Sequence, residues 1–272
     1  MPRLAVIGFP VGHSRSPAMQ NAALAALGLG EEWSYEAIEV APPDFEVKVR
    51  AMAAAGFAGA NVTVPYKEAA LVLADESSAA AKAIGAANTL SFSAGRIAAD
   101  NTDSGGLLAA LRGSLRTGRA LVLGAGGAAR AAIWALGAGG ASVDASHPPF
   151  EVDVWNRTGA RAAMVAAELG GNAVDSPIQA KYGLIVNTTA VGLHGEDPFE
   201  HLPLSAGGFA AEQVVVDMVY GEQPSPLLGA AADAGATVVD GLEVLVQQGA
   251  LSLRIWTGRE PPIDVMRAAA RA

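Results

Sequence analysis

The sequence of 272 residues contains no cysteine, and both histidine and lysine are scarce. Without thiols the chain cannot form disulfides, thiolate metal sites or a cysteine nucleophile. The four histidines are too widely spaced for the paired ligands of a metal site, so no metal is expected: His13, His147, His194 and His201. Only four lysines stand against 14 arginines, so Lys67, directly after an apolar strand, is an unusual choice for this chain.

Long apolar runs and a basic surface are lacking too. No stretch of 18 apolar residues is free of charges, Gly and Pro, so no membrane span is expected. The N-terminal apolar run, about seven residues, is too short for a signal peptide. A net charge of −9 and a pI near 4.9 argue against a nucleic-acid partner. We therefore expect a soluble cytoplasmic protein, in which a small anionic substrate could still bind in a locally positive cleft. The sequence does not decide between a monomer and a homodimer.

The first part of the chain alternates apolar strands with amphipathic helices. Hydrophobic residues make up 51% of the sequence, enough for a sizeable core. The alternation predicts an α/β unit with a mostly parallel sheet. The expected elements are strands at 3–8, 33–40 and 59–64, helices at 17–28 and 44–56, a helical region at 66–88, and a hairpin at 88–101 that turns at Ala94-Gly95.

A second strand–helix series starts near residue 120. Strands are expected at 120–123, 152–156, 183–187, 214–219 and 237–240, and a last long helix at 241–258. That helix is apolar enough to pack back onto the first lobe. The sequence therefore predicts two α/β lobes, 1–103 completed by 241–272, and 104–240.

A glycine-rich turn follows the strand "ALVL" and opens a helix. Residues 124–129 match G-x-G-x-x-A, in which Gly124 allows the tight turn and Gly126 lets the backbone approach a pyrophosphate. Ala129 allows close helix–sheet packing, and the helix N-terminus offers amide donors. A turn without ligand is the alternative, but the strand–turn–helix context favours a dinucleotide.

The end of the next strand indicates which dinucleotide. An NAD site usually places an acid there to hold the ribose 2′-hydroxyl. This chain has Asn156-Arg157-Thr158 and then Arg161, whereas Asp153 lies in mid-strand. Asn and Thr can hydrogen-bond a 2′-phosphate and Arg can clamp it, so NADP is predicted. Surface arginines after a helix cap are the alternative.

Two serines lie in the loop "GFPVGHSRSP" before the first helix. Ser14 and Ser16 are two residues apart, so both hydroxyls can point at one anion, for which a carboxylate is a natural partner. Ser16 could instead be a helix N-cap, although that would leave Ser14 without a role.

The chain resembles the shikimate dehydrogenase family through nine motifs, in order and over nearly its whole length. They are "GFPVGHSRSPAMQN", "NVTVPYK", "GAANTL", "DNTDSGG", "GAGGAARA", "NRT", "NTT", "DMVY" and "DGLEVLVQQG". The resemblance implies a substrate lobe, a Rossmann-like NADP lobe and a cleft between them. It also implies reversible NADPH-dependent reduction of 3-dehydroshikimate to shikimate, in the pathway to chorismate and the aromatic amino acids.

The resemblance also assigns residues. Ser14 and Ser16 would hold the substrate carboxylate, and Lys67 with Asp103 would be the acid–base pair. Further substrate contacts would be Asn61, Thr63, Asn88, Tyr220 and Gln248. Cofactor contacts would be Gly124, Ala125, Gly126, Gly127, Ala128, Asn156, Arg157, Thr158 and Arg161, with Thr189, Met218 and Gly241 near the nicotinamide half.

The chemistry of reduction supports this reading of the pair. Hydride delivery to a ketone leaves a developing alkoxide, which needs a proton or a positive charge. Lysine can supply both, whereas arginine does not readily give up a proton. Taken alone, Asp103 could be a helix N-cap and Lys67 a solvated charge.

In the strand before Lys67, Val62 and Val64 should be buried while Asn61 and Thr63 face the substrate.

Three other functions remain open from the sequence. A relative could also accept quinate or use NAD, a dinucleotide-binding regulatory protein could have lost catalysis, and a two-lobe dehydrogenase of similar outline could act on folates.

The segment "ASVDASHPPFEV", before the strand expected at 152–156, is longer than the family usually has at this position. Because it precedes a parallel strand, we expect a surface loop on the edge opposite the cofactor, with no assigned role for His147.

Overall fold

The computed structural model describes residues 1–114, 118–142, 149–221 and 225–272. It forms two compact units: unit 1 is Met1–Gly106 with Leu245–Ala272, and unit 2 is Leu107–Val244. The chain passes between the units inside two helices, α5 (Asp103–Ala110) and α10 (Gly241–Thr257). The boundaries expected from sequence were 103 and 240. His147 and half of the expected surface loop, residues 143–148, lie outside the described residues.

Unit 1 contains a six-stranded mixed sheet in the order β2-β1-β3-β5-β6-β4. Strand β1 pairs in parallel with β2 and β3, β4 pairs in parallel with β6, and β5 is antiparallel to β3 and β6. The carboxyl ends of β1 and β3 therefore meet at one edge. The strands are β1 (Arg3–Gly8), β2 (Ser34–Glu39), β3 (Phe57–Val62), β4 (Glu76–Ser77), β5 (Thr89–Ser93) and β6 (Arg96–Asp100).

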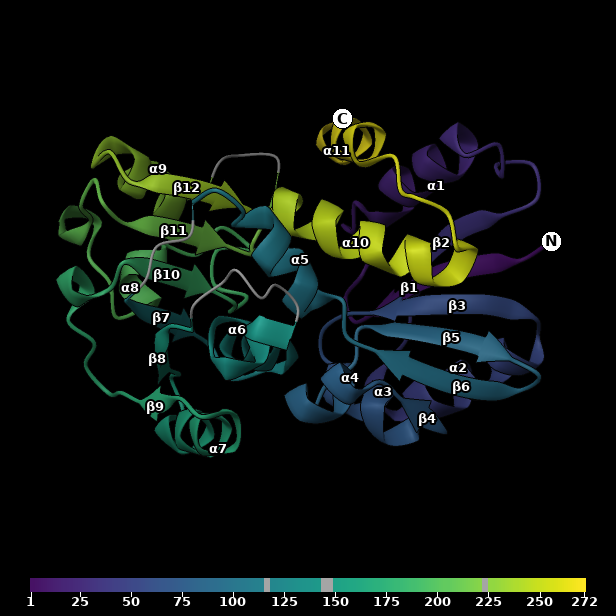
Figure 1. The fold of residues 1–272 in the computed structure, drawn as a ribbon, viewed down its shortest axis with the longest axis horizontal. Coiled ribbons are helices and arrows are strands. Elements are labelled where there is room, and N and C mark those ends of the chain that lie inside the picture. Colours follow the sequence, from purple (N-terminus) through teal and green to yellow (C-terminus); the bar gives the residue numbers. More distant parts are fainter. Residues whose placement is uncertain (115–117, 143–148, 222–224) are drawn as a thin grey trace. The chain divides into compact units, whose positions relative to one another are not determined.

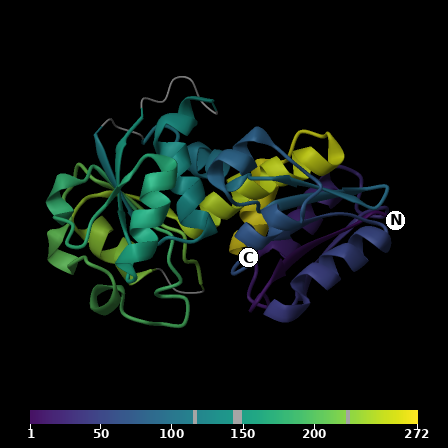
Figure 2. The ribbon, with the colours of Figure 1, turned by 90° about the horizontal axis from the view of Figure 1, so that it is seen from below.

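Helices cover both faces of this sheet (Figure 1, Figure 2). Ala5 and Ile7 of β1 share a buried cluster with residues of α2 and α3, while α1 packs against α11 beside α10. Alternate strand residues thus face different helix layers, which explains the near-continuous apolar runs. The helices are α1 (Ser16–Ala26), α2 (Phe45–Ala54) after the 3₁₀ turn η1 (Pro42–Asp44), α3 (Lys67–Leu73), α4 (Ala79–Ile84) and α11 (Ile263–Arg271).

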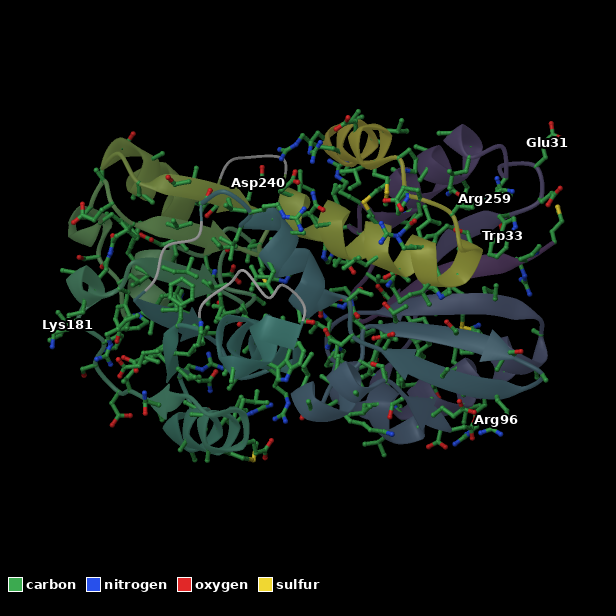
Figure 3. All side chains as sticks on the ribbon, in the orientation of Figure 1. Glu31, Trp33, Arg96, Lys181, Asp240 and Arg259 are labelled. Atoms are coloured by element: carbon green, nitrogen blue, oxygen red, sulfur yellow. The ribbon has the colours of Figure 1, made fainter. Side chains whose placement is uncertain are left out.

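The predicted β5–β6 hairpin turns at the expected residues. Ala94 and Gly95 have φ of 49° and 76°, the two positive values that a type I′ two-residue hairpin turn requires. Arg96, which lies on the outside of unit 1 in Figure 3, pairs with Glu76 of β4 at 2.7 Å. This short, charged strand ends the sheet and limits further strand pairing there.

Two details of the opening strand–helix series differ from prediction. Residues 66–88 do not form one helical region, because the short strand β4 lies between α3 and α4. The Asp75 carboxylate accepts a hydrogen bond from the Ile97 amide, and the Ser78 side chain caps the start of α4. Strand β3 ends at Val62, and Val64 is 60% exposed rather than buried. The amide of Tyr66 bonds the Thr63 carbonyl, and this turn carries Val64 out of the sheet.

Unit 2 contains a fully parallel six-stranded sheet in the order β12-β11-β10-β7-β8-β9. Numbered along this unit alone, that order is 3-2-1-4-5-6 read from β9, which is the Rossmann arrangement with its switch point between β7 and β10. The predicted fold class is confirmed. The strands are β7 (Arg119–Leu123), β8 (Glu151–Trp155), β9 (Asn172–Ala173), β10 (Leu184–Asn187), β11 (Val214–Asp217) and β12 (Thr237–Asp240).

Two helix layers sandwich this sheet as well. Val122 and Val186 belong to the buried cluster with α6 and α7, whereas Leu121 and Ile185 belong to the cluster with α9. Asp153, in mid-strand as predicted, is 2% exposed and accepts from Arg119 and Tyr182 at 2.8 Å each. The helices are α6 (Gly127–Leu136), α7 (Gly159–Leu169), α8 (Pro198–His201) and α9 (Pro226–Asp233), with 3₁₀ turns η2 (Ala138–Ser142), η3 (Gln179–Lys181) and η4 (Ala206–Gly208).

Candidate active site

A lysine–aspartate pair lies in unit 1, near the end of β3. Lys67 is the first residue of α3 and Asp103 the first of α5. The Lys67 Nζ lies 2.6 Å from the Asp103 Oδ2, and the two side chains are only 14% and 12% exposed. The Ser104 amide is bonded by the side chain of Asn101 at 3.3 Å, so the capping role at this helix start falls to Asn101. The structure thus brings together two residues that are 36 positions apart.

Asn88 connects this pair to the C-terminal part of unit 1. Its Nδ2 lies 2.9 Å from the Asp103 Oδ1 and 3.0 Å from the Oε1 of Gln248 on α10. Its Oδ1 accepts from the Thr102 amide at 2.7 Å. Four of the predicted residues, Lys67, Asn88, Asp103 and Gln248, therefore form one connected polar cluster.

Asn61 lies behind this cluster and is 5% exposed. Its Oδ1 accepts from the Tyr35 hydroxyl at 2.7 Å, and its Nδ2 donates to the Ser252 Oγ at 2.9 Å. The Oγ atoms of Thr89, Thr102 and Ser252 lie within 3.2 Å of one another. Asn61 is thus bonded to protein groups at both ends of its amide.

Sequence reasoning did not single out Tyr35 or these three hydroxyls. The only available signal was the position of Ser252 on α10, one helical turn after Gln248 and on the same face. Threonine and serine within apolar segments carry no distinctive pattern of their own.

The two serines of the N-terminal loop stand at the start of α1. Ser14 is half-buried and Ser16 is 4% exposed. The Ser14 Oγ accepts from the Ser16 amide at 3.3 Å, and the helix has no side-chain cap bond from its N-cap residue, Arg15. Ser16 is therefore not the N-cap. Half-buried Thr63 borders the same sheet edge, since its Cγ2 would lie 2.4 Å from a Cβ placed on Gly8.

The glycine-rich turn of unit 2 has the geometry that a pyrophosphate needs. Gly124 has φ of +118°, and Gly126 is the N-cap of α6 without a side-chain cap bond. A Cβ on Gly126 would meet nothing within 4 Å, so the backbone there borders open space. Free space beside a helix N-terminus suits the close approach of a phosphate to backbone amides. The residues present at this turn therefore fit a dinucleotide.

The residues after β8 stand beside that turn, at the end of the neighbouring strand. The Gly124 amide donates to the Trp155 carbonyl at 2.8 Å, which fixes the turn next to Asn156. Arg157, Thr158 and Arg161 are exposed, and Arg161 Nη2 donates to the Ala125 carbonyl at 3.3 Å. Two arginines at this position suit the 2′-phosphate of NADP.

The remaining predicted residues of unit 2 follow β10 and β11 or begin α10. Thr189, Met218 and Tyr220 are half-buried, and Gly241 is buried. A Cβ on Gly241 would lie 2.6 Å from the Met218 carbonyl oxygen, so this position needs glycine. Tyr220 belongs to unit 2, unlike the other predicted substrate contacts.

Comparison with known proteins gives the family. The chain is 40% identical over 268 residues to the shikimate dehydrogenase (NADP(+)) of Brucella abortus (strain S19), covering 95% of this chain and 89% of that protein. The chain belongs to the shikimate dehydrogenase family. Residues 6–90 match the model of the shikimate dehydrogenase substrate binding domain, and residues 241–271 that of the shikimate 5'-dehydrogenase C-terminal domain.

Solved structures of this family share the whole fold. The shikimate 5-dehydrogenase of Thermus thermophilus, crystallised with NADP(H) and shikimate, is 43% identical with a TM-score of 0.87, covering 100% of this chain and 99% of that chain. The 5-ketofructose reductase of a Gluconobacter species (strain CHM43) is 27% identical with a TM-score of 0.82, covering 99% and 97%. The family fold thus also occurs in a protein named for a different substrate.

The described residues contain neither a metal-binding cluster nor a membrane-spanning helix. No group of three or more His, Asp or Glu side chains in the described ranges could hold a metal ion. Among the helices of the same ranges, none has the length and apolar character needed to cross a membrane.

Proposed function

We propose that this protein catalyses the reversible NADPH-dependent reduction of 3-dehydroshikimate to shikimate, with Lys67 and Asp103 as its acid–base pair. Membership of the family makes it an NADP-dependent oxidoreductase of the shikimate pathway. The direction of the reaction and the roles of individual residues are our proposal.

The close contact of Lys67 with Asp103 is the observation that carries this proposal. The two groups are 2.6 Å apart and mostly shielded from water. When bound, NADPH supplies the hydride that reduces the ketone. The Lys67 ammonium stabilises the negative charge that develops on the ketone oxygen and donates a proton to it. Asp103 holds the ammonium in place and can accept a hydrogen bond from an adjacent substrate hydroxyl.

Other polar groups of unit 1 orient the substrate. Ser14 and Ser16, at the start of α1, offer hydroxyls and helix amides to the carboxylate. Asn88 and Gln248 hold ring hydroxyls, and each is fixed by the bond between them at 3.0 Å. Thr63 and Tyr220 line the substrate site, and Asn61 belongs to the same site. The enclosed amide of Asn61 suits a role in placing Asn88, to whose carbonyl it donates at 3.2 Å.

Groups of unit 2 hold NADP in this proposal. The turn from Gly124 to Ala128 carries the pyrophosphate on backbone amides. The 2′-phosphate is bound by Asn156, Arg157, Thr158 and Arg161, and the nicotinamide half is lined by Thr189, Met218 and Gly241.

Initial rates with four substrate–cofactor combinations test the proposal. Shikimate and quinate are each oxidised with NADP and NAD, and reduced cofactor is followed by its absorbance. We expect a high kcat/KM for shikimate with NADP and far lower values for the other three. Comparable rates with quinate or NAD would indicate a quinate/shikimate dehydrogenase of relaxed choice. NADP binding without turnover of shikimate would indicate a dinucleotide-binding protein that has lost catalysis.

A further inference from the structure

Two polar residues end neighbouring strands at the carboxyl edge of the unit 2 sheet. Asn187 is the last residue of β10 and Asp217 the last of β11, and the two are register partners in the parallel ladder. Asn187 is 0% exposed and Asp217 is 2% exposed. The strand residues before them are apolar, so an amide and a carboxylate here interrupt an otherwise hydrophobic layer.

The polar atoms of this pair bond to the loops that follow the two strands. The Asn187 Nδ2 donates to the Asp217 Oδ1 at 2.9 Å. The Asn187 Oδ1 accepts from the Thr189 amide at 3.0 Å and from its hydroxyl at 2.8 Å. Asp217 accepts from the Val219 amide at 3.1 Å and from the Ser225 hydroxyl. One hydrogen-bonded chain therefore runs from Thr189 to Ser225.

The same chain of contacts reaches the glycine-rich turn. Thr188 follows Asn187, and its hydroxyl donates to the Leu123 carbonyl at 2.7 Å. A Cβ on Gly124 would lie 2.5 Å from the Thr188 Oγ1, so the two loops are in direct contact. This is the switch point between β7 and β10, where ligands of open α/β sheets bind.

Stability alone does not explain a buried carboxylate in this position. The partners named above are neutral, and burial raises the pKa of the Asp217 carboxyl although its hydrogen bonds oppose the rise. Replacing both partners of a buried hydrogen bond by apolar groups of the same shape can be nearly neutral for stability. Asp153 differs, because it lies in mid-strand and is paired with Arg119.

We infer that Asn187 and Asp217 are positioning residues that hold the two loops carrying Thr189 and Met218 against the nicotinamide half of the cofactor. This inference rests on the proposed function, which assigns those loops to the nicotinamide. Neither residue touches the reacting atoms. Their effect is to fix the backbone of both loops before NADP arrives, which reduces the ordering that binding would otherwise require.

Binding of two ligands to Asn187→Ala tests the inference. NADP contains both halves of the cofactor, whereas adenosine 2′,5′-bisphosphate lacks the nicotinamide half and needs only the turn and the arginines. We expect the variant to lose about tenfold or more in NADP affinity by calorimetry. Its affinity for adenosine 2′,5′-bisphosphate should stay at the wild-type value. Asp217→Asn keeps the shape of the side chain and one of its two acceptor oxygens, which can still accept from Asn187 and Val219. It should retain most of the NADP affinity.

Gln213→Ala is the matched control. Gln213 is also 2% exposed and precedes β11 at the opposite edge of the sheet, where its Nε2 donates to the Tyr182 carbonyl at 2.8 Å. Its loss should lower the melting temperature without changing either affinity. Should Asn187→Ala not fold, Asn187→Leu fills the space with a side chain that has no donor or acceptor, and should weaken NADP in the same selective way.

Two results would overturn the inference. One is an unchanged NADP affinity in the Asn187 variants, and the other is an equal loss of both ligands, which would indicate a general loosening of unit 2. Failure of the proposed function looks different, because wild-type protein would then not oxidise shikimate with NADP, whatever the affinities of the variants.

Discussion

The lysine at position 67 has chemistry that an arginine could not supply. A guanidinium stays protonated at all accessible pH values, whereas an ammonium can donate its proton to an alkoxide and recover it. Lys67 is held by Asp103 at 2.6 Å and by its place at the start of α3. In a chain with four lysines, this is the one whose substitution should affect chemistry most.

Lys67→Ala should lower kcat far more than it raises KM, because the charge that develops in the transition state loses its partner. Loss of general acid–base catalysis predicts a fall of about 10²–10⁴-fold in steady-state shikimate oxidation, the direction in which the pair accepts the proton. Lys82→Ala, at an exposed lysine on α4 of the same unit, should leave both constants unchanged. A rise in KM with an unchanged kcat would make Lys67 a binding residue only.

Arg157 gives a separate prediction about the cofactor. Charge-assisted hydrogen bonds are worth about 1.5–3 kcal/mol, so Arg157→Ala should raise the KM for NADPH about tenfold to a hundredfold. The KM for 3-dehydroshikimate should stay near the wild-type value. NADH has no 2′-phosphate, and its weak activity should be unaffected.

The exposed Arg112, in the same unit, provides a charge-matched control. Arg112→Ala should leave NADPH kinetics unchanged. An equal loss of NADPH and NADH activity in Arg157→Ala would contradict contact with the 2′-phosphate.

Single residues also show what sequence could and could not predict. The glycine turn and the strand end at Asn156 were readable from spacing, because both depend on a few adjacent residues. The proximity of Lys67 to Asp103 came from the family resemblance, since no periodicity relates residues in different elements. Ser252 was missed because its partners Asn61 and Thr102 come from distant segments, 191 and 150 residues away.

At the scale of elements, α10 brings Gln248 into the polar cluster through an unusually close helix contact. A Cβ placed on Gly106 of α5 would lie 2.5 Å from the Gln248 Cβ and 2.7 Å from its Cα. The absence of a side chain at Gly106 lets the two backbones approach, and the position of Gln248 depends on that approach. Both residues belong to unit 1.

Gly106→Ala should push α5 and α10 apart. Overpacking of this kind typically costs about 1–3 kcal/mol, measured as a loss of unfolding free energy in urea. The KM for shikimate should rise, since Gln248 and its partner Asn88 are displaced. Gly229→Ala is the control, because a Cβ there in α9 meets nothing within 4 Å and alanine favours helix. An unchanged KM and stability in Gly106→Ala would show that the contact is not tight.

Element types were easier to predict than element ends. The longer strands and the helices α1, α2, α6 and α10 followed from apolar runs bounded by Gly and Pro. The end of β3 was predicted too late, because the alternation of valine and polar residues continues through Val64 although the chain has already turned at Thr63. Strand β4 has only two residues and depends on bonds to β6, which local sequence does not encode.

At the scale of the whole molecule, unit 1 is built from two separate segments of the chain, and unit 2 lies between them in the sequence. Unit 1 is closed by α10 and α11 from the C-terminal end, while unit 2 is one continuous segment. The expectation from sequence that the last helices complete the first lobe rested only on the apolar character of the last long helix and on the family motifs. Each unit has its own buried clusters, so damage to one core should remain largely within that unit.

Met266→Ala tests this independence. Met266 of α11 is fully buried, and α11 packs on α1 within unit 1. Truncation should cost unit 1 about 2–5 kcal/mol and separate its unfolding from that of unit 2. Adenosine 2′,5′-bisphosphate identifies the unit 2 transition, because a ligand stabilises only the unit that binds it. Val165→Ala, in the core of unit 2, should shift the other transition. One transition that moves as a whole in both variants would show that the units unfold together.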